Sequence, residues 1–229
     1  MKRLLWRLLL LTIGLVLAYQ LWLFAHVWWW VEHNPSRSAF MSTRLAVLRE
    51  DDPEAELHHR WVPYERISIH LKRAVMAAED SRFTDHEGFD WEGMQTAWEK
   101  NLKKGRIVAG GSTISQQLAK NLFLSGKRTP WRKLEEAAIT VMLEHMMSKR
   151  RIYEIYLNVI EWGDGVFGAE AAARHYYRKS ASGLGPAEAA RLAAMVPNPR
   201  FYDKHRHTRY LERRTRTIQK RMHQVRPPR

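Results

Sequence analysis

The stretch Ile67–Gly88, ISIHLKRAVMAAEDSRFTDHEG, carries the clearest structural pattern in the chain. Its apolar residues fall at the i, i+3, i+4 and i+7 spacing of one helix face: Leu71, Ala74, Val75 and Ala78. The pattern predicts a helix that ends at Glu79. A carboxylate there faces the negative pole of the helix, which should raise its pKa and make it a better base. Polar residues also collect at helix ends for other reasons, so composition alone favours a capped, solvated turn.

A second motif, Gly110–Asn121, reads GGSTISQQLAKN and leads from a loop into a helix. Its glycines allow close approach of the backbone. Lys120 adds a positive charge near the end of the motif. The neutral hydrogen-bonding groups between the glycines and Lys120 are Ser112, Thr113, Ser115, Gln116 and Gln117. Such a loop can hold a phosphate or a sugar, and it can equally be a simple helix cap. The glycine spacing of a nucleotide-binding P-loop is absent.

Pro130 is predicted to begin a further helix, because proline fits the first helical turn. The side expected to be buried is apolar: Leu134, Ala138, Val141, Met142 and Met146. A second row steps by four residues and is typical of ordinary amphipathic surface: Glu136, Thr140, Glu144 and Ser148.

Basic residues cluster around this helix and the start of the next: Lys127, Arg128, Arg132, Lys133, Lys149, Arg150 and Arg151. Arginine and lysine side chains on consecutive helices can hold a pyrophosphate through charge-assisted hydrogen bonds. A solvated basic face is the alternative interpretation.

The remaining segments carry weaker signals. Residues 169–177 and 186–196 are predicted to be helical, whereas no run of residues indicates a strand. Residues 32–66 mix polar, charged and proline positions and are expected to form a linker and domain entry. The basic segment 200–229 has little apolar periodicity and is expected to be a solvated extension, with contact to anionic lipid headgroups as the alternative.

The N-terminal segment predicts a membrane anchor. Residues 8–31 contain no Asp, Glu, Lys or Arg and span ~36 Å as a helix, enough to cross a bilayer. Lys2, Arg3 and Arg7 precede the run, so residues 1–7 are expected in the cytoplasm and the rest of the chain outside. The run is too long for a cleaved signal peptide and ends in Trp28–Trp30, which favours an uncleaved anchor.

Length and composition limit the possible functions. The chain has 229 residues, enough for one globular domain beside the anchor. It contains no cysteine, which excludes disulfides, thiolate metal sites and a cysteine nucleophile. The formal net charge of +14 indicates a polyanionic partner, without choosing among nucleic acid, lipid headgroups and a phosphorylated substrate.

Taken in order, these motifs resemble the peptidoglycan glycosyltransferase family, which includes the transglycosylase domain of bifunctional penicillin-binding proteins. The resemblance runs from about Ile67 to Pro199. It rests on EDSRFTDHEG from Glu79, GGSTISQQLAKN from Gly110, RKLEEA from Arg132, SKRRIYEIYLN from Ser148 and GVFGAEAAARHYY from Gly165. Two departures are Ser115, where threonine is frequent in the family, and Arg178, where glycine is frequent. No S-x-x-K motif occurs, so the resemblance is to a monofunctional biosynthetic form without a transpeptidase.

The resemblance implies a mainly α-helical, lysozyme-like domain at residues 67–199, with a small membrane-facing lobe. It implies that Glu79 is the general base and that Glu136 is a second catalytic glutamate near the departing pyrophosphate. The implied substrate-binding residues are Asp80, Phe83, His86, Ser112, Thr113, Gln116, Gln117, Lys120, Arg128, Arg132, Lys133 and Lys149. A divalent cation, Mg²⁺, is implied near Glu79 and Asp80.

The implied reaction transfers a lipid-pyrophosphate-linked glycan chain onto the 4-hydroxyl of lipid II, with inversion, to form β-1,4 links. The expected partners are lipid II, the growing chain, membrane lipids and other proteins of wall synthesis or division, and not nucleic acid. The expected location is the bacterial inner membrane, with the domain on the periplasmic side. A lytic glycosidase of similar fold and a membrane-tethered basic scaffold remain as alternative functions.

Overall fold

The computed structural model describes residues 1–106, 110–124 and 129–229. It divides into two compact units, Met1–Pro35 and Ser36–Arg229. The first unit contains one long helix, α1 (Lys2–Glu32), whose mean hydropathy reaches 2.1 and which is long enough to cross a membrane. The predicted N-terminal apolar helix is therefore confirmed.

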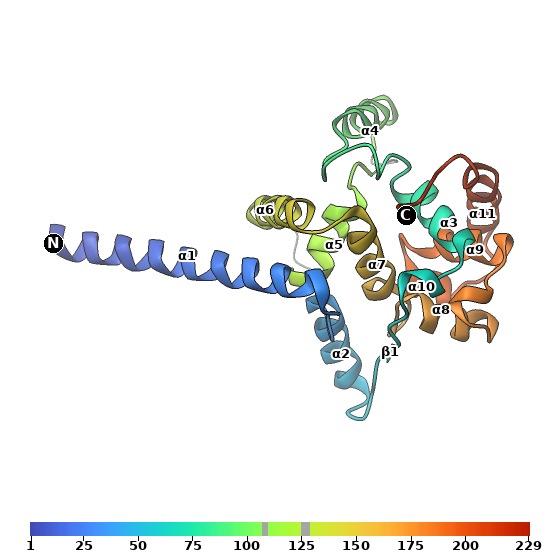
Figure 1. The fold of residues 1–229 in the computed structure, drawn as a ribbon, viewed down its shortest axis with the longest axis horizontal. Helices are drawn as coiled ribbons and strands as arrows, with labels where there is room; N and C mark the ends of the chain where they lie inside the picture. The colour runs from blue at the N-terminus through green and yellow to red at the C-terminus, as the bar shows by residue number, and fades with distance from the viewer. Residues whose placement is uncertain (107–109, 125–128) are drawn as a thin grey trace. The chain divides into compact units, whose positions relative to one another are not determined.

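The second unit is mainly helical, as predicted (Figure 1). In chain order its elements are α2 (Ala39–Asp51), β1 (His58–His59), η1 (Tyr64–Arg66), α3 (Ile69–Glu79), α4 (Trp91–Lys104), α5 (Ile114–Phe123), α6 (Pro130–Met146), α7 (Lys149–Val159), β2 (Glu161–Gly163), β3 (Val166–Phe167), α8 (Ala169–Tyr177), η2 (Ala181–Gly183), α9 (Pro186–Met195), α10 (Pro199–Lys204) and α11 (Arg209–Arg221).

Side-chain caps fix the starts of the helices that carry the motifs. Ser68 accepts a hydrogen bond from the backbone of α3, and Thr113, Thr129 and Ser148 do the same for α5, α6 and α7. Pro130 occupies the first turn of α6, as predicted. The helix predicted to end at Glu79 does end there.

The core lies in two groups of helices. In one, α9 packs against both α3 and α11, and in the other, α5 packs against α6 and α7 (Figure 1). Fully buried apolar residues fill both groups: Leu71, Val75, Leu118, Leu122, Ile155, Leu157, Leu192 and Leu211. The stretch from Leu71 to Glu79 thus holds the candidate base on a helix anchored by the core.

A small three-stranded sheet is present, although no run of residues indicated a strand. β3 pairs in parallel with β1 and antiparallel with β2. Each strand has two or three residues, which is too short for the alternating pattern of a strand to be recognised. Gly168, at φ +83°, follows β3, and a Cβ there would lie 2.7 Å from the Asn158 carbonyl, so the turn into α8 requires glycine.

Two segments outside the predicted domain are built into the fold. The expected linker 32–66 contains α2, which packs against α5, and the expected extension 200–229 contains α11, which packs against α9 and α3. Each helix buries few apolar side chains, Met41 and Leu45 in α2 and Leu211 and Ile218 in α11. In α11 the two buried residues, Leu211 and Ile218, are seven positions apart, and the residues between them include several basic ones. The sequence therefore shows no continuous apolar face for this helix.

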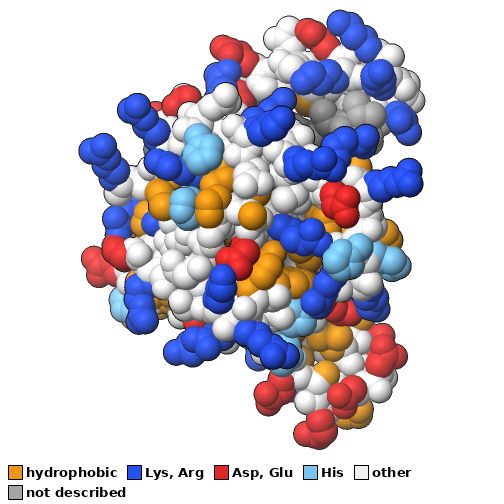
Figure 2. Space-filling view, turned by 90° about the vertical axis from the view of Figure 1, so that its right-hand side faces the viewer, with side chains coloured by type: hydrophobic (Ala, Val, Ile, Leu, Met, Phe, Trp, Pro, Cys, Tyr) orange, Lys and Arg blue, Asp and Glu red, His pale blue; other side chains and the backbone are white. Residues whose placement is uncertain are grey.

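The buried side of α6 was predicted incorrectly. Leu134 and Val141 are exposed, whereas Glu136 and Thr140 are buried together with Ile139 and Leu143. The row of polar residues therefore faces the interior, and part of the apolar row faces outward. Basic side chains are spread over the face of the molecule drawn in Figure 2, in keeping with the net charge of +14.

Replacing Leu211 with alanine tests whether α11 is part of the core. Because the Leu211 side chain is fully buried, we expect the free energy of unfolding to fall by about 2–5 kcal/mol. Chemical unfolding of the full chain in detergent micelles, followed by near-ultraviolet circular dichroism, measures it. Arg216→Ala, on the exposed side of α11, should change stability by less than about 0.5 kcal/mol. Equal stability of both variants would contradict the packing of α11.

Candidate active site

A cleft of about 160 Å³ lies at the C-terminal end of α3. Glu79 and Asp80 line one side, and the segment 110–113 lines another, with Ser112 and Thr113 among its residues. A Cβ on Gly111 would lie 3.2 Å from the Met94 backbone, so glycine lets this segment approach α4 closely. The first two motifs therefore meet at one cleft.

Glu79 is held by side chains from two other helices. The Gln117 amide on α5 donates to Glu79 Oε2 at 3.1 Å, and Arg214 Nη2 on α11 lies 3.3 Å from Glu79 Oε1. The Tyr156 hydroxyl on α7 donates to Gln117 Oε1 at 2.9 Å. That bond occupies the amide oxygen, so the NH₂ group of Gln117 is presented to the carboxylate.

The pKa of the Glu79 carboxyl is raised above its ordinary value, as the sequence predicted, but burial is the main cause. The Gln117 hydrogen bond and the charges of Arg214 and Lys120 oppose the shift, and the nearby Asp80 adds to it. Desolvation outweighs the cations because the side chain is almost enclosed. The result is a carboxylate with increased affinity for a proton, which suits a general base.

Asp80 ties the turn after α3 to the start of α5. His86 Nε2 lies 3.1 Å from both Asp80 oxygens, and the Ile114 backbone N–H donates to Oδ2 at 3.0 Å. Phe83 is fully buried and packs beside Tyr153. Asp80, Phe83 and His86 therefore hold the shape of the cleft through contacts with other protein groups.

Thr113 and Gln116 also have protein partners. They form the capping box of α5, in which Thr113 Oγ1 accepts from Gln116 N and Gln116 Oε1 accepts from Thr113 N. Thr113 also donates to the Gly88 carbonyl at 2.7 Å, which joins the ends of the first two motifs. Of the neutral groups predicted in this motif, Ser112 and Thr113 line the cleft, and Gln117 contacts Glu79.

The predicted cations occupy different surroundings. Lys133 is ion-paired with Glu136, whose side chain is 5% exposed. Lys149 donates to the buried Glu144 at 2.8 Å, and Ser115 donates to the same oxygen. Arg132, at the start of α6, has a buried Nε without a hydrogen-bond partner among the described residues. Arg128 lies outside the described residues.

The described side chains do not form an all-protein cage for Mg²⁺ at Glu79 and Asp80. Each oxygen of Asp80 lies within hydrogen-bond distance of a protein donor, His86 Nε2 or the Ile114 backbone N–H. Among the described residues, no group of three or more His, Asp or Glu is placed to hold a metal ion. Magnesium is usually held by one or two carboxylates together with water and substrate phosphates, so a cation here would depend on the bound substrate.

Sequence reasoning missed Arg214 and Tyr156 as residues of the site. Arg214 lies in the basic segment 200–229, where it is one of many cations, so nothing in the sequence distinguishes it. Tyr156 was contained in the quoted motif SKRRIYEIYLN and could have been included from it. Glu144, counted with the amphipathic surface of α6, is instead the buried partner of Lys149.

Comparison with known proteins agrees with this geometry. The family model described as Transglycosylase matches residues 46–223. A biosynthetic peptidoglycan transglycosylase of Methylobacillus flagellatus is 70% identical over 227 residues, which is 99% of both chains. Proteins of the same description from Chromobacterium violaceum and Laribacter hongkongensis are 64% and 68% identical, over 100% and 94% of this chain and 100% and 95% of theirs.

The chain therefore belongs to the transglycosylase family. Its similar relatives are biosynthetic peptidoglycan transglycosylases, so the predicted membership of the peptidoglycan glycosyltransferase family is confirmed, and with it the enzyme class. The matched region begins in α2 and ends beyond α11, so it extends into both segments that the prediction left outside the domain.

Replacing Asp80 with alanine separates a structural role from a metal-binding one. The buried Ile114 N–H would lose its acceptor, so we expect a loss of about 1–3 kcal/mol in the free energy of unfolding. The exposed Asp85→Ala is the matched control. A fully stable Asp80→Ala chain whose activity required much higher Mg²⁺ would instead support the metal site.

Proposed function

We propose that this chain polymerises the glycan strands of peptidoglycan, with Glu79 as the general base. The observation that carries the proposal is a nearly enclosed carboxylate with a raised pKa, fixed by Gln117 and Arg214 at the edge of a cleft in a chain of the transglycosylase family. The similar relatives are named for peptidoglycan synthesis.

In this reaction Glu79 accepts the proton of the acceptor sugar's 4-hydroxyl as that oxygen attacks the anomeric carbon of the donor. The bond from that carbon to the pyrophosphate breaks on the opposite face, which inverts an α-linked donor to a β-1,4 link. Holding the carboxylate on both sides reduces the reorganisation needed for proton transfer. The substrates are lipid II and the growing lipid-linked chain.

The departing pyrophosphate needs positive charge rather than a strong acid. Arg132 and Lys133 at the start of α6 are candidates to supply it, together with Lys120. The buried Glu136 holds Lys133 through its ion pair and thereby positions that charge. The guanidinium of Arg132 has no ion-pair partner among the described residues, so its outer nitrogens are candidates to bind a phosphate oxygen.

Exposed apolar side chains support a location at the membrane surface. Trp91, Trp98 and Leu102 on α4 are 65–70% exposed, and Trp131 and Leu134 on α6 are 80% and 63% exposed. Tryptophan favours the interface between lipid and water, and lysines lie among these residues on α4. These helices would meet the outer leaflet of the inner membrane, with α1 as the anchor and its N-terminus in the cytoplasm.

Replacing Glu79 with glutamine tests the assignment of the base. Loss of a positioned base should lower the rate of polymer formation by about 10²–10⁴-fold. The assay incubates the purified full chain with lipid II, with and without Mg²⁺, and measures glycan length. Glu212→Gln on the exposed side of α11 makes the same chemical change away from the cleft and should leave the rate unchanged. Release of fragments from isolated cell wall, without polymer from lipid II, would contradict the proposal and indicate a lytic glycosidase.

The charge of Arg214 should set the pH at which activity is lost. Glu79 acts in its ionised form, so activity falls as the pH drops through its raised pKa. Arg214 lowers that pKa, and Arg214→Gln should therefore move the acidic limb of the kcat/KM profile to higher pH. Arg214→Lys should move the limb back toward its original position. An unchanged acidic limb in Arg214→Gln would show that Arg214 does not act through Glu79.

A further inference from the structure

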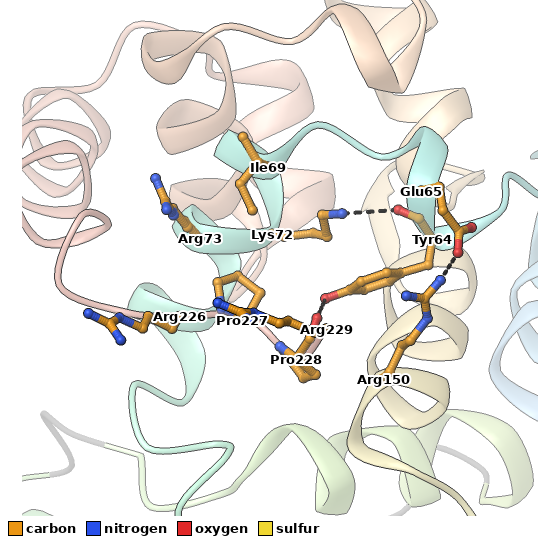
Figure 3. A pocket seen from close by; sticks show the side chains of 10 residues that line it. All are labelled: Tyr64, Glu65, Ile69, Lys72, Arg73, Arg150, Arg226, Pro227, Pro228 and Arg229. Atoms are coloured by element: carbon orange, nitrogen blue, oxygen red, sulfur yellow. Dashed lines mark hydrogen bonds and ion pairs between the residues drawn. The ribbon is translucent and has the colours of Figure 1, made fainter.

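A second cavity, of about 420 Å³, lies at the N-terminal half of α3 (Figure 3). Its walls come from η1, α3, the start of α7 and the segment 226–229. Its volume falls within the usual range for small-molecule sites. Lys72, which lines it, precedes Glu79 by seven residues on the same helix, or about 10 Å along the axis. The cavity is therefore separate from the cleft that holds the candidate base.

Tyr64 organises the wall of this cavity. Its hydroxyl donates to the Pro228 carbonyl at 2.7 Å, which holds the segment 226–229 in place. The Lys72 ammonium lies 4.0 Å from the centre of the Tyr64 ring, and the Arg150 guanidinium lies 4.8 Å from it. Lys72 and Arg150 thus both make cation–π contacts with the Tyr64 ring (Figure 3).

Basic side chains outnumber acidic side chains on the lining of this cavity. Five basic side chains line the cavity against one acidic side chain, Glu65, and Glu65 is already ion-paired with Arg150. Lys72 is only 8% exposed, and it donates to the Tyr64 carbonyl at 3.1 Å. No carboxylate among the described residues pairs with Lys72 or with Arg73.

Arg73, the next residue on α3, also lines the cavity and has no ion-pair partner among the described residues. Its Nε is enclosed, so the outer nitrogens of the guanidinium are the atoms that a ligand in the cavity can reach. The two head groups point apart, Lys72 toward Tyr64 and Arg73 away from it (Figure 3). An anion in the cavity would offset the positive charge of both side chains.

We propose that this cavity binds an oxyanion, a phosphate or carboxylate group carried by a larger molecule. Arg73 offers a planar guanidinium for paired hydrogen bonds to two oxygens, and Lys72 offers a point charge. Apolar surface from Ile69, Pro227 and Pro228 lies beside the cations and would contact the carbon skeleton that bears the anion.

Calorimetric titration of the full chain in nonionic detergent tests this proposal. The probes are inorganic phosphate and succinate, each added at constant ionic strength against sodium chloride, so that general screening is matched. Saturable binding of phosphate, of succinate or of both supports the proposal, and the stronger probe identifies the source of the oxyanion. Failure of both probes to bind saturably would overturn it.

Variants locate the binding. Arg73→Gln should weaken binding about tenfold, the effect of losing one charge-assisted hydrogen bond. Lys72→Met should weaken it at least as much, and Arg73→Gln alone carries the test if the Lys72 variant does not fold. Arg216→Gln removes the same charge from an exposed position on α11 and should bind as the unmodified chain does.

Arg132→Gln distinguishes this cavity from the cleft, because Arg132 is a candidate to bind the pyrophosphate and does not line the cavity. Binding that survives in Arg132→Gln and is weakened in Arg73→Gln supports the second site, whatever becomes of the polymerase activity. Binding that is unchanged in Arg73→Gln, or that is lost in Arg132→Gln alone, would assign the anion to the cleft and overturn the proposal.

Discussion

The burial of one carboxylate at the end of α3 is the constraint on which the rest of the site depends. Glu79 would be unstable as an isolated buried charge, so it requires donors on both sides. Gln117 and Arg214 supply them from α5 and α11. These helices are far apart in the chain, and they meet at Glu79 because α9 and α11 pack against α3 and because Asp80 joins α5 to the turn after α3.

The polar side of α6 follows the same logic. Glu136, Thr140 and Glu144 face inward although their spacing resembles that of a solvent-exposed surface. Each carboxylate has a lysine partner, Lys133 or Lys149, so the burial of negative charge is compensated. Part of the apolar row is consequently turned outward, which adds to the exposed tryptophan and leucine surface on α4 and α6. One choice of helix orientation thus provides a charged interior and an apolar exterior.

The sequence allowed the principal helices to be predicted because their signals are local. The apolar spacing before Glu79, the loop that leads into α5 and the proline at α6 each depend on neighbouring residues, and all were found at or close to the expected positions. The strands, α2 and α11 were missed because their stability comes from distant contacts. Arg214 was missed for the same reason, since its role depends on a contact across 135 positions of the chain. The ordered motifs identified the family, but they could not separate residues that touch the cleft from those, such as Phe83, that build its walls.

In the proposed reaction, the direction of the hydrogen bonds around Glu79 limits the route of the proton that it accepts. Gln117 presents an amide N–H to one oxygen, and its own carbonyl is occupied by Tyr156. Arg214 presents a guanidinium N–H to the other oxygen. Neither neighbour can accept a proton from Glu79, because an amide nitrogen and a guanidinium have no free acceptor. In the proposed reaction the proton therefore leaves toward the cleft, which is also the side from which the glycan product departs.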